Sequence, residues 1–66
     1  MTIVYQGEQV ETGAANVADF LAERGVDPEK ALVEFAGEVY APGADLKAVA
    51  LADGAALDVF RIVAGG

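Results

Sequence analysis

A single segment of this chain has the apolar spacing of a helix, and the segment is short. Val17, Phe20 and Leu21 fall at positions i, i+3 and i+4 within residues 16–24, so their side chains form one apolar stripe. The asparagine at the start can cap the helix, and Gly25 suits the left-handed conformation that ends many helices. One helix of about nine residues is marginal in water, so it must pack on something else.

Strand patterns surround this helix. Five segments have β-branched, aromatic or alternating residues that predict strands: residues 2–5, 8–12, 31–35, 38–41 and 57–62. Gln6-Gly7 joins the first two segments as a turn, which predicts a hairpin. Asp53-Gly54 is a second strong turn signal, and residues 45–51 have room for one helical or 3₁₀ turn.

The order hairpin, helix, strand, strand, strand predicts one α+β domain. A hairpin cannot hide its apolar face alone, so the economical arrangement lays the one helix across one face of a mixed four- or five-stranded sheet. The last strand needs a crossover to return beside the first, so we expect these two strands to pair in parallel. This is the β-grasp, or ubiquitin-like, fold over residues 1–66. The predicted core comprises Ile3, Tyr5, Val17, Phe20, Leu21, Val33, Phe35, Leu57 and Val59.

Composition excludes several functions. The chain has no cysteine and no histidine, which removes thiolate and imidazole chemistry, disulfides and Cys/His metal sites. The net charge of -7 disfavours nucleic acid and anionic membranes as partners and favours a protein with a basic groove. No apolar run approaches a membrane span or a signal peptide, so we expect a cytoplasmic protein that is a monomer when free. Carboxylate pairs such as Asp27 and Glu29 lack the nucleophile, base or pocket of an enzyme.

The chain ends in Ala64-Gly65-Gly66, predicted as a flexible tail over residues 64–66. Such an end is either a frayed terminus without a function or a group that takes part in a reaction. A carboxylate is a poor electrophile until it is converted to a mixed anhydride with AMP, and that step requires threading the tail into an ATP-binding enzyme. Glycines let the backbone enter a channel too narrow for a Cβ atom. Gly66 is therefore the candidate reacting residue, with Gly65 and Ala64 as candidate recognition residues.

The sequence resembles the sulfur-carrier proteins of thiamin biosynthesis, the ThiS family, which are relatives of ubiquitin and of the molybdopterin synthase small subunit. The resemblance covers the whole chain, and Asp53-Gly54, ten residues through Ala64, and then Gly65-Gly66 carry its most specific part. Residues 60–66 resemble the family's aromatic and apolar approach to the tail. Residues 17–21 resemble the family's helix start, and residues 37–39 its central turn.

The resemblance implies a cycle carried out by other enzymes. An E1-like adenylating enzyme, ThiF-like, uses ATP and Mg²⁺ to adenylate Gly66, and a sulfur relay fed by a cysteine desulfurase converts the adenylate to a thiocarboxylate. A ThiG-like thiazole synthase then takes the sulfur to build the thiazole ring. On this interpretation the chain is a carrier rather than an enzyme, and it binds no cofactor of its own.

Phe60 alternates with the predicted core residues of its strand, so it faces away from the helix. An aromatic side chain exposed near the tail is either a docking contact, together with Leu32 on the same outward parity, or an ordinary surface residue. Arg61 either packs its stem inward or guides the tail. Three alternatives to the thiamin carrier remain: a sulfur carrier for molybdopterin or another pathway, a ubiquitin-like modifier of lysine, and an interaction module with an inert tail.

Overall fold

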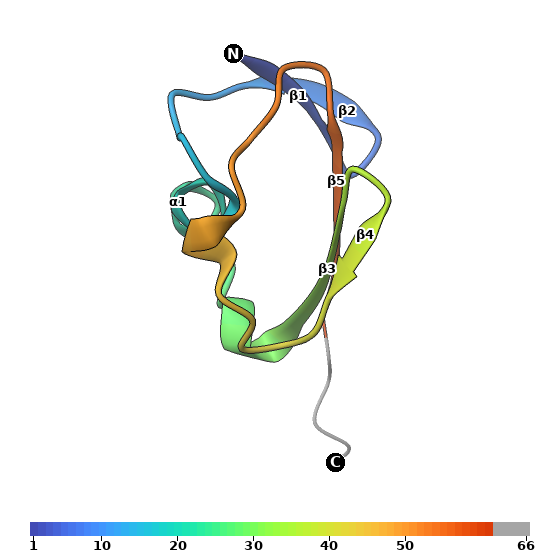
Figure 1. The fold of residues 1–66 in the computed structure, drawn as a ribbon. Helices are drawn as coiled ribbons and strands as arrows, with labels where there is room; N and C mark the ends of the chain where they lie inside the picture. Colours follow the sequence, from blue (N-terminus) through green and yellow to red (C-terminus); the bar gives the residue numbers. More distant parts are fainter. Residues whose placement is uncertain (62–66) are drawn as a thin grey trace.

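A five-stranded mixed sheet, with α1 packed across one of its faces, forms the described part of the chain (Figure 1). The computed structural model describes residues 1–61. The strands lie in the order β2-β1-β5-β3-β4. Their bounds are Thr2–Tyr5 for β1, Glu8–Glu11 for β2, Ala31–Phe35 for β3, Glu38–Tyr40 for β4 and Ala56–Arg61 for β5. The predicted β-grasp fold is confirmed.

β5 is the central strand and pairs with both halves of the chain. It runs parallel to β1, with Tyr5 opposite Leu57, as the crossover argument predicts. On its other edge it runs antiparallel to β3, from Phe35 opposite Leu57 to Ala31 opposite Arg61. The last described residues of the chain therefore belong to a strand in the middle of the sheet.

Two-residue turns connect the hairpins β1–β2 and β3–β4. Both central residues have positive φ in each turn: 51° and 83° at Gln6-Gly7, and 51° and 86° at Ala36-Gly37. These values are those of type I′ turns, whose twist matches that of the strands. Gln6 and Ala36 occupy a position that favours Asn or Gly, so both turns are strained at a residue with a Cβ atom.

The helix α1 spans Val17–Glu23, seven residues within the predicted range 16–24, and the two predicted end residues, Asn16 and Arg24, are its caps. Asn16 is the N-cap, and its side-chain oxygen accepts a hydrogen bond of 2.8 Å from the backbone N–H of Asp19. Gly25 follows with φ of 70°, in the left-handed region. Two 3₁₀ turns complete the crossovers: η1, Pro28–Lys30, and η2, Leu46–Ala48, which is one of the two options open for residues 45–51.

The core lies between α1 and the sheet. Eight of the nine predicted core residues are buried, and Tyr5 is the exception: it is half-buried at the edge of the core. Its ring meets the Phe20 ring edge to face at a centroid distance of 5.0 Å, and the Arg24 guanidinium lies 5.4 Å from the Tyr5 centroid. The core also contains five buried residues that the sequence did not predict. Ala31 is the first residue of β3, and the other four lie in loops and turns: Ala14, Val26, Leu46 and Leu51.

Three predicted strand limits differ by one residue from those in the structure. The strand β2 ends at Glu11 rather than Thr12, and β4 ends at Tyr40 rather than Ala41. β5 begins one residue earlier than predicted, at Ala56. Its predicted last residue, Ile62, lies outside the described residues. Alternation of side chains does not mark where backbone pairing stops, so these limits depend on the partner strands.

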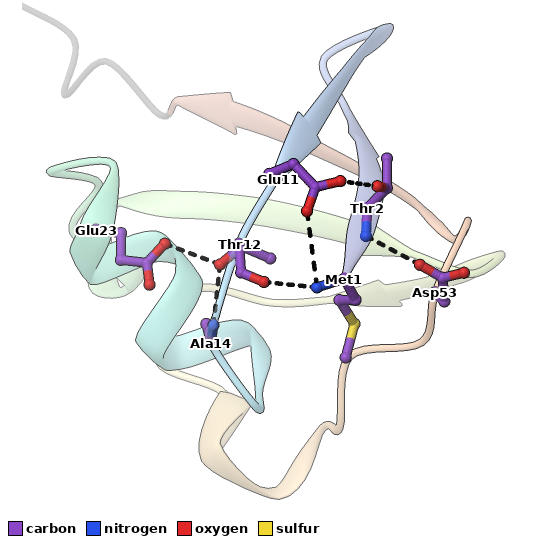
Figure 2. A network of polar contacts seen from close by, with 7 residues as sticks. All are labelled: Met1, Thr2, Glu11, Thr12, Ala14, Glu23 and Asp53. Atoms are coloured by element: carbon purple, nitrogen blue, oxygen red, sulfur yellow. Dashed lines mark hydrogen bonds and ion pairs between the residues drawn. The ribbon is translucent and has the colours of Figure 1, made fainter.

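A polar network around Thr12 joins the first hairpin to α1 (Figure 2). The buried Thr12 hydroxyl donates to Glu23 Oε1 at 2.8 Å and accepts from the backbone N–H of Ala14 at 3.0 Å. The N-terminal ammonium donates to the Thr12 carbonyl at 2.9 Å. Asp53 accepts from the backbone N–H of Thr2 at 2.9 Å, which ties the last turn before β5 to β1.

Candidate functional site

The candidate site is the end of β5, from which the chain continues toward Gly66. β3 supports one edge of β5 as far as Arg61, whereas β1 pairs with the other edge only as far as Leu57. The last backbone hydrogen bond on the β1 side of β5 is the one that the Gln6 N–H donates to the Leu57 carbonyl, at 3.1 Å. Beyond that point β5 has lost its neighbouring strand on one edge.

The side chain of Gln6 takes the place of the missing strand. Its Nε2 donates to the Val59 carbonyl at 2.9 Å, and its Oε1 accepts from the Val59 N–H at 3.0 Å. A carboxamide offers one donor and one acceptor side by side, as a peptide group does. The parallel ladder is thus extended by two hydrogen bonds past the end of β1. This contact fixes the final part of β5 on the sheet and with it the point from which the tail starts.

The two predicted docking residues lie together on the sheet face opposite α1. Leu32 in β3 is directly opposite Phe60 in β5, and both have the parity that points away from the buried Val59. Phe60 is 54% exposed, while Leu32 is partly buried. The structure therefore brings these two side chains to one place, one residue from the end of the described strand. Their role in docking stays a prediction.

The remaining predicted site residues, Ala64, Gly65 and Gly66, lie outside the described residues, so their roles also stay predictions. Arg61, for which the sequence left two options, is exposed at the end of β5. Within residues 1–61, no group of three acidic side chains is placed to hold a metal ion. No helix in this part of the chain is long and apolar enough to cross a membrane.

Two features of the site were missed by reasoning from the sequence. Gln6 was assigned only to a turn, and nothing in its sequence context indicates that it reaches Val59, 53 positions away. The second feature is a pair of carboxylates, because β3 and β5 place Glu34 directly opposite Asp58 on the same face as Phe60. Both features depend on strand register, which alternation alone does not specify between distant strands.

Comparison with known proteins places this arrangement in a family. No protein-family model matches the chain, and no curated protein matches it in sequence. Among solved structures, the crystal structure of the thiamine biosynthesis protein ThiS from Geobacter metallireducens is similar over 100% of both chains, with a TM-score of 0.79 and 30% sequence identity. The likeness thus includes all five strands, the helix and the full length of the chain, and we conclude that the chain belongs to the ThiS family of thiamine biosynthesis proteins.

Proposed function

We propose that this protein is a sulfur carrier in thiamine biosynthesis and that the carboxyl carbon of Gly66 is its reacting atom. The observation that carries the proposal is the full-length similarity to a ThiS protein. The residue content supports it, because a chain with no cysteine and no histidine has no thiol or imidazole to carry sulfur or catalyse its transfer. The main-chain carboxyl group then remains as the carrier.

The chemistry divides into two steps performed by partners. In the first, a carboxylate oxygen of Gly66 attacks the α-phosphorus of ATP on a ThiF-like enzyme, which gives the acyl adenylate and releases pyrophosphate. In the second, the terminal sulfur of a partner persulfide attacks the acyl carbon, and AMP leaves. Two electrons from a thiol cleave the sulfur–sulfur bond and leave the thiocarboxylate. A ThiG-like thiazole synthase consumes this sulfur, and the carboxylate is restored. Mg²⁺ and ATP belong to the activating enzyme.

In the described structure β5 is held firmly in the fold, which suits a strand that leads to the reacting end of the chain. Leu57 and Val59 are buried and anchor the strand in the core, and the Gln6 carboxamide holds Val59 from the edge. The strand therefore presents the following residues from a fixed starting point. The five residues from Ile62 to Gly66 can reach about 16 Å when extended, which is long enough to enter a buried nucleotide site on a partner.

The direct test is intact-mass measurement after incubation with ATP, Mg²⁺, a ThiF-like enzyme and a persulfide source. We expect a mass gain equal to the replacement of one oxygen by sulfur, lost again when thiazole synthase and its substrates are added. Two control variants, one lacking Gly66 and one extended by a residue after Gly66, should fold normally and stay unmodified. The same measurement on protein isolated from cells establishes whether Gly66 carries a free carboxylate there.

The alternatives predict different products in the same experiments. A carrier for molybdopterin or another pathway forms the thiocarboxylate but does not pass its sulfur to thiazole synthase. A ubiquitin-like modifier gives covalent conjugates with lysines of other proteins in cell extract. An inert interaction module gives no mass change with any adenylating enzyme, and that result would overturn the proposal.

A further inference from the structure

Asp53-Gly54 is the only Asp-Gly sequence in the chain, and it lies in the turn before β5. In such a sequence the backbone nitrogen of the glycine can attack the Cγ atom of the aspartate, which closes a five-membered succinimide ring. Glycine hinders this attack least, because it has no Cβ atom. Both residues are exposed, and a Cβ atom built on Gly54 would meet nothing within 4 Å. The turn therefore leaves room for ring closure and for the entry of water.

One residue of β1 binds both groups that have to react. The backbone N–H of Thr2 donates to Asp53 Oδ1 at 2.9 Å (Figure 2), and the Thr2 carbonyl accepts from the Gly54 N–H at 2.7 Å. Ring closure removes the proton from the Gly54 nitrogen and an oxygen from the Asp53 carboxyl group. Both groups are engaged while the two hydrogen bonds are intact. Thr2 therefore blocks ring closure in the closed fold.

These two hydrogen bonds stand at the end of a series that joins β1 to the β5 side of the sheet. The Val4 N–H donates to the Ala55 carbonyl at 2.9 Å, and the Gln6 N–H donates to the Leu57 carbonyl at 3.1 Å. Thr2 is the first residue of β1, and the ends of elements open at a lower free energy than the core does. Thr2 can thus separate from the turn while Val4 and Gln6 keep β1 in the sheet.

We propose that Asp53 is a site of spontaneous covalent modification, where aspartate is converted to isoaspartate at a rate set by the release of Thr2 from the turn. First, the Gly54 nitrogen bonds to Asp53 Cγ, and water leaves with the proton of the nitrogen and the hydroxyl group of the protonated carboxyl group. Water then adds to the imide. Addition at Cγ restores aspartate, whereas addition at the main-chain carbonyl breaks its bond to the Gly54 nitrogen and leaves isoaspartate. Neither step needs an oxidant, a reductant or a second protein.

Isoaspartate changes the turn, because the main chain then passes through the Cβ and Cγ atoms of residue 53. The chain between residues 53 and 54 becomes longer by one CH₂ group, and the former main-chain carbonyl becomes the free carboxylate. The carboxylate and the Gly54 N–H no longer have the spacing that Thr2 binds. β5 begins at Ala56, so the conversion loosens the start of the central strand. The inference is independent of the proposed function, because none of these atoms belongs to the tail.

Conversion in the globally unfolded chain is the competing route, and two substitutions distinguish it from release of Thr2. Thr2→Pro removes the N–H that binds Asp53, and proline is compatible with the first residue of a strand. Gln6→Ala removes two hydrogen bonds to Val59 and lowers the total stability without touching Thr2. Local release predicts faster conversion in Thr2→Pro, whereas global unfolding predicts the larger effect in Gln6→Ala.

The test measures the rate of isoaspartate formation in the full chain at neutral pH. A protein isoaspartyl methyltransferase with labelled methyl donor gives the amount, and fragmentation by electron transfer gives the position. The samples are the folded parent, the parent in urea, and the folded variants Thr2→Pro and Gln6→Ala. Asp53→Glu provides the blank, because glutamate needs a six-membered ring, which closes far more slowly. Circular dichroism establishes that the variants fold, and native-state hydrogen exchange gives the protection of the Gly54 amide.

We expect Asp53 to be the main site of isoaspartate in urea. Folding should slow its conversion by the factor by which it slows exchange of the Gly54 amide, because one opening frees both groups. Thr2→Pro should convert about fivefold faster than the folded parent, the effect of losing one hydrogen bond, and Gln6→Ala should convert at the parent rate.

Equal rates with and without urea, isoaspartate spread evenly over the other aspartates, or a larger acceleration in Gln6→Ala than in Thr2→Pro would each overturn the inference. If Thr2→Pro does not fold, Gln6→Ala decides alone. The parent rate in Gln6→Ala supports release of Thr2, and faster conversion there overturns it.

Discussion

Replacing Gln6 by alanine tests whether a side chain really completes the sheet at the end of β5. The carboxamide makes two hydrogen bonds to the Val59 backbone, at 2.9 and 3.0 Å. At a net value of about 1 kcal/mol each, their loss costs about 2 kcal/mol. Alanine has the same difficulty as glutamine at φ of 51°, so backbone strain does not change and the difference reports the two bonds.

This cost is a large share of the total stability. A domain of 66 residues has a free energy of unfolding of roughly 3–10 kcal/mol, so a loss of 2 kcal/mol lowers Tm by roughly 10 °C. The variant Gln6→Gly provides a second comparison, because it loses the same bonds but relieves about 1 kcal/mol of left-handed strain. We therefore expect its unfolding free energy to lie between those of Gln6→Ala and the parent.

Native-state hydrogen exchange locates the effect. The backbone groups of Val59 point toward the β1 side, whereas those of Asp58 and Phe60 point toward β3, because the Ala36 N–H donates to the Ala56 carbonyl on that side. In Gln6→Ala the Val59 amide should lose more than about tenfold in protection beyond any change shared by its two neighbours. If the three amides change equally, the carboxamide does not hold the strand, and the argument for a fixed starting point of the tail fails.

Three further substitutions test other parts of the fold. Ala36→Asn should raise Tm by roughly 4–8 °C in thermal unfolding. Asparagine tolerates the positive φ of this turn position, so the change relieves about 1 kcal/mol of strain. An unchanged Tm would contradict the type I′ assignment. Thr12→Val should cost about 1–2 kcal/mol in denaturant unfolding, because it removes the hydroxyl bonded to Glu23 and Ala14, whereas Thr12→Ser should keep most of the stability. Leu57→Ala should cost about 2–5 kcal/mol by leaving a cavity beneath α1, enough to show a substantial unfolded fraction by circular dichroism at 37 °C.

The sequence predicts the architecture well because each local signal agrees with the next. The cap at Asn16, the left-handed Gly25 and the apolar stripe of the helix all indicate the same element, and the structure has it there. The crossover argument gives the parallel pairing of β1 with β5. The missed core residues, such as Leu46 and Leu51, lie in a 3₁₀ turn and a loop. Such segments have no period, so only the path of the chain over the core reveals that they are buried.

The candidate site is less predictable for a physical reason. Outward parity within one strand predicts that Phe60 is exposed, and the structure agrees. The contact between Gln6 and Val59 and the opposition of Glu34 and Asp58 need the register between strands distant in sequence. A shift of two residues would preserve every buried face and separate Glu34 from Asp58, so the hydrophobic pattern cannot distinguish the two registers.

A last prediction concerns the like-charge contact between Glu34 and Asp58 on the sheet face opposite α1. Glu34→Lys places an ammonium group opposite Asp58 and replaces a like-charge contact by an attractive one, so the free energy of unfolding should rise by about 0.5–1 kcal/mol. Glu34→Gln removes the repulsion without adding an attraction, so its gain in stability should be smaller. Thermal unfolding of the parent and of the two variants measures both gains. A stability that is unchanged or lower in both variants would mean that the two carboxylates do not repel each other in the folded protein.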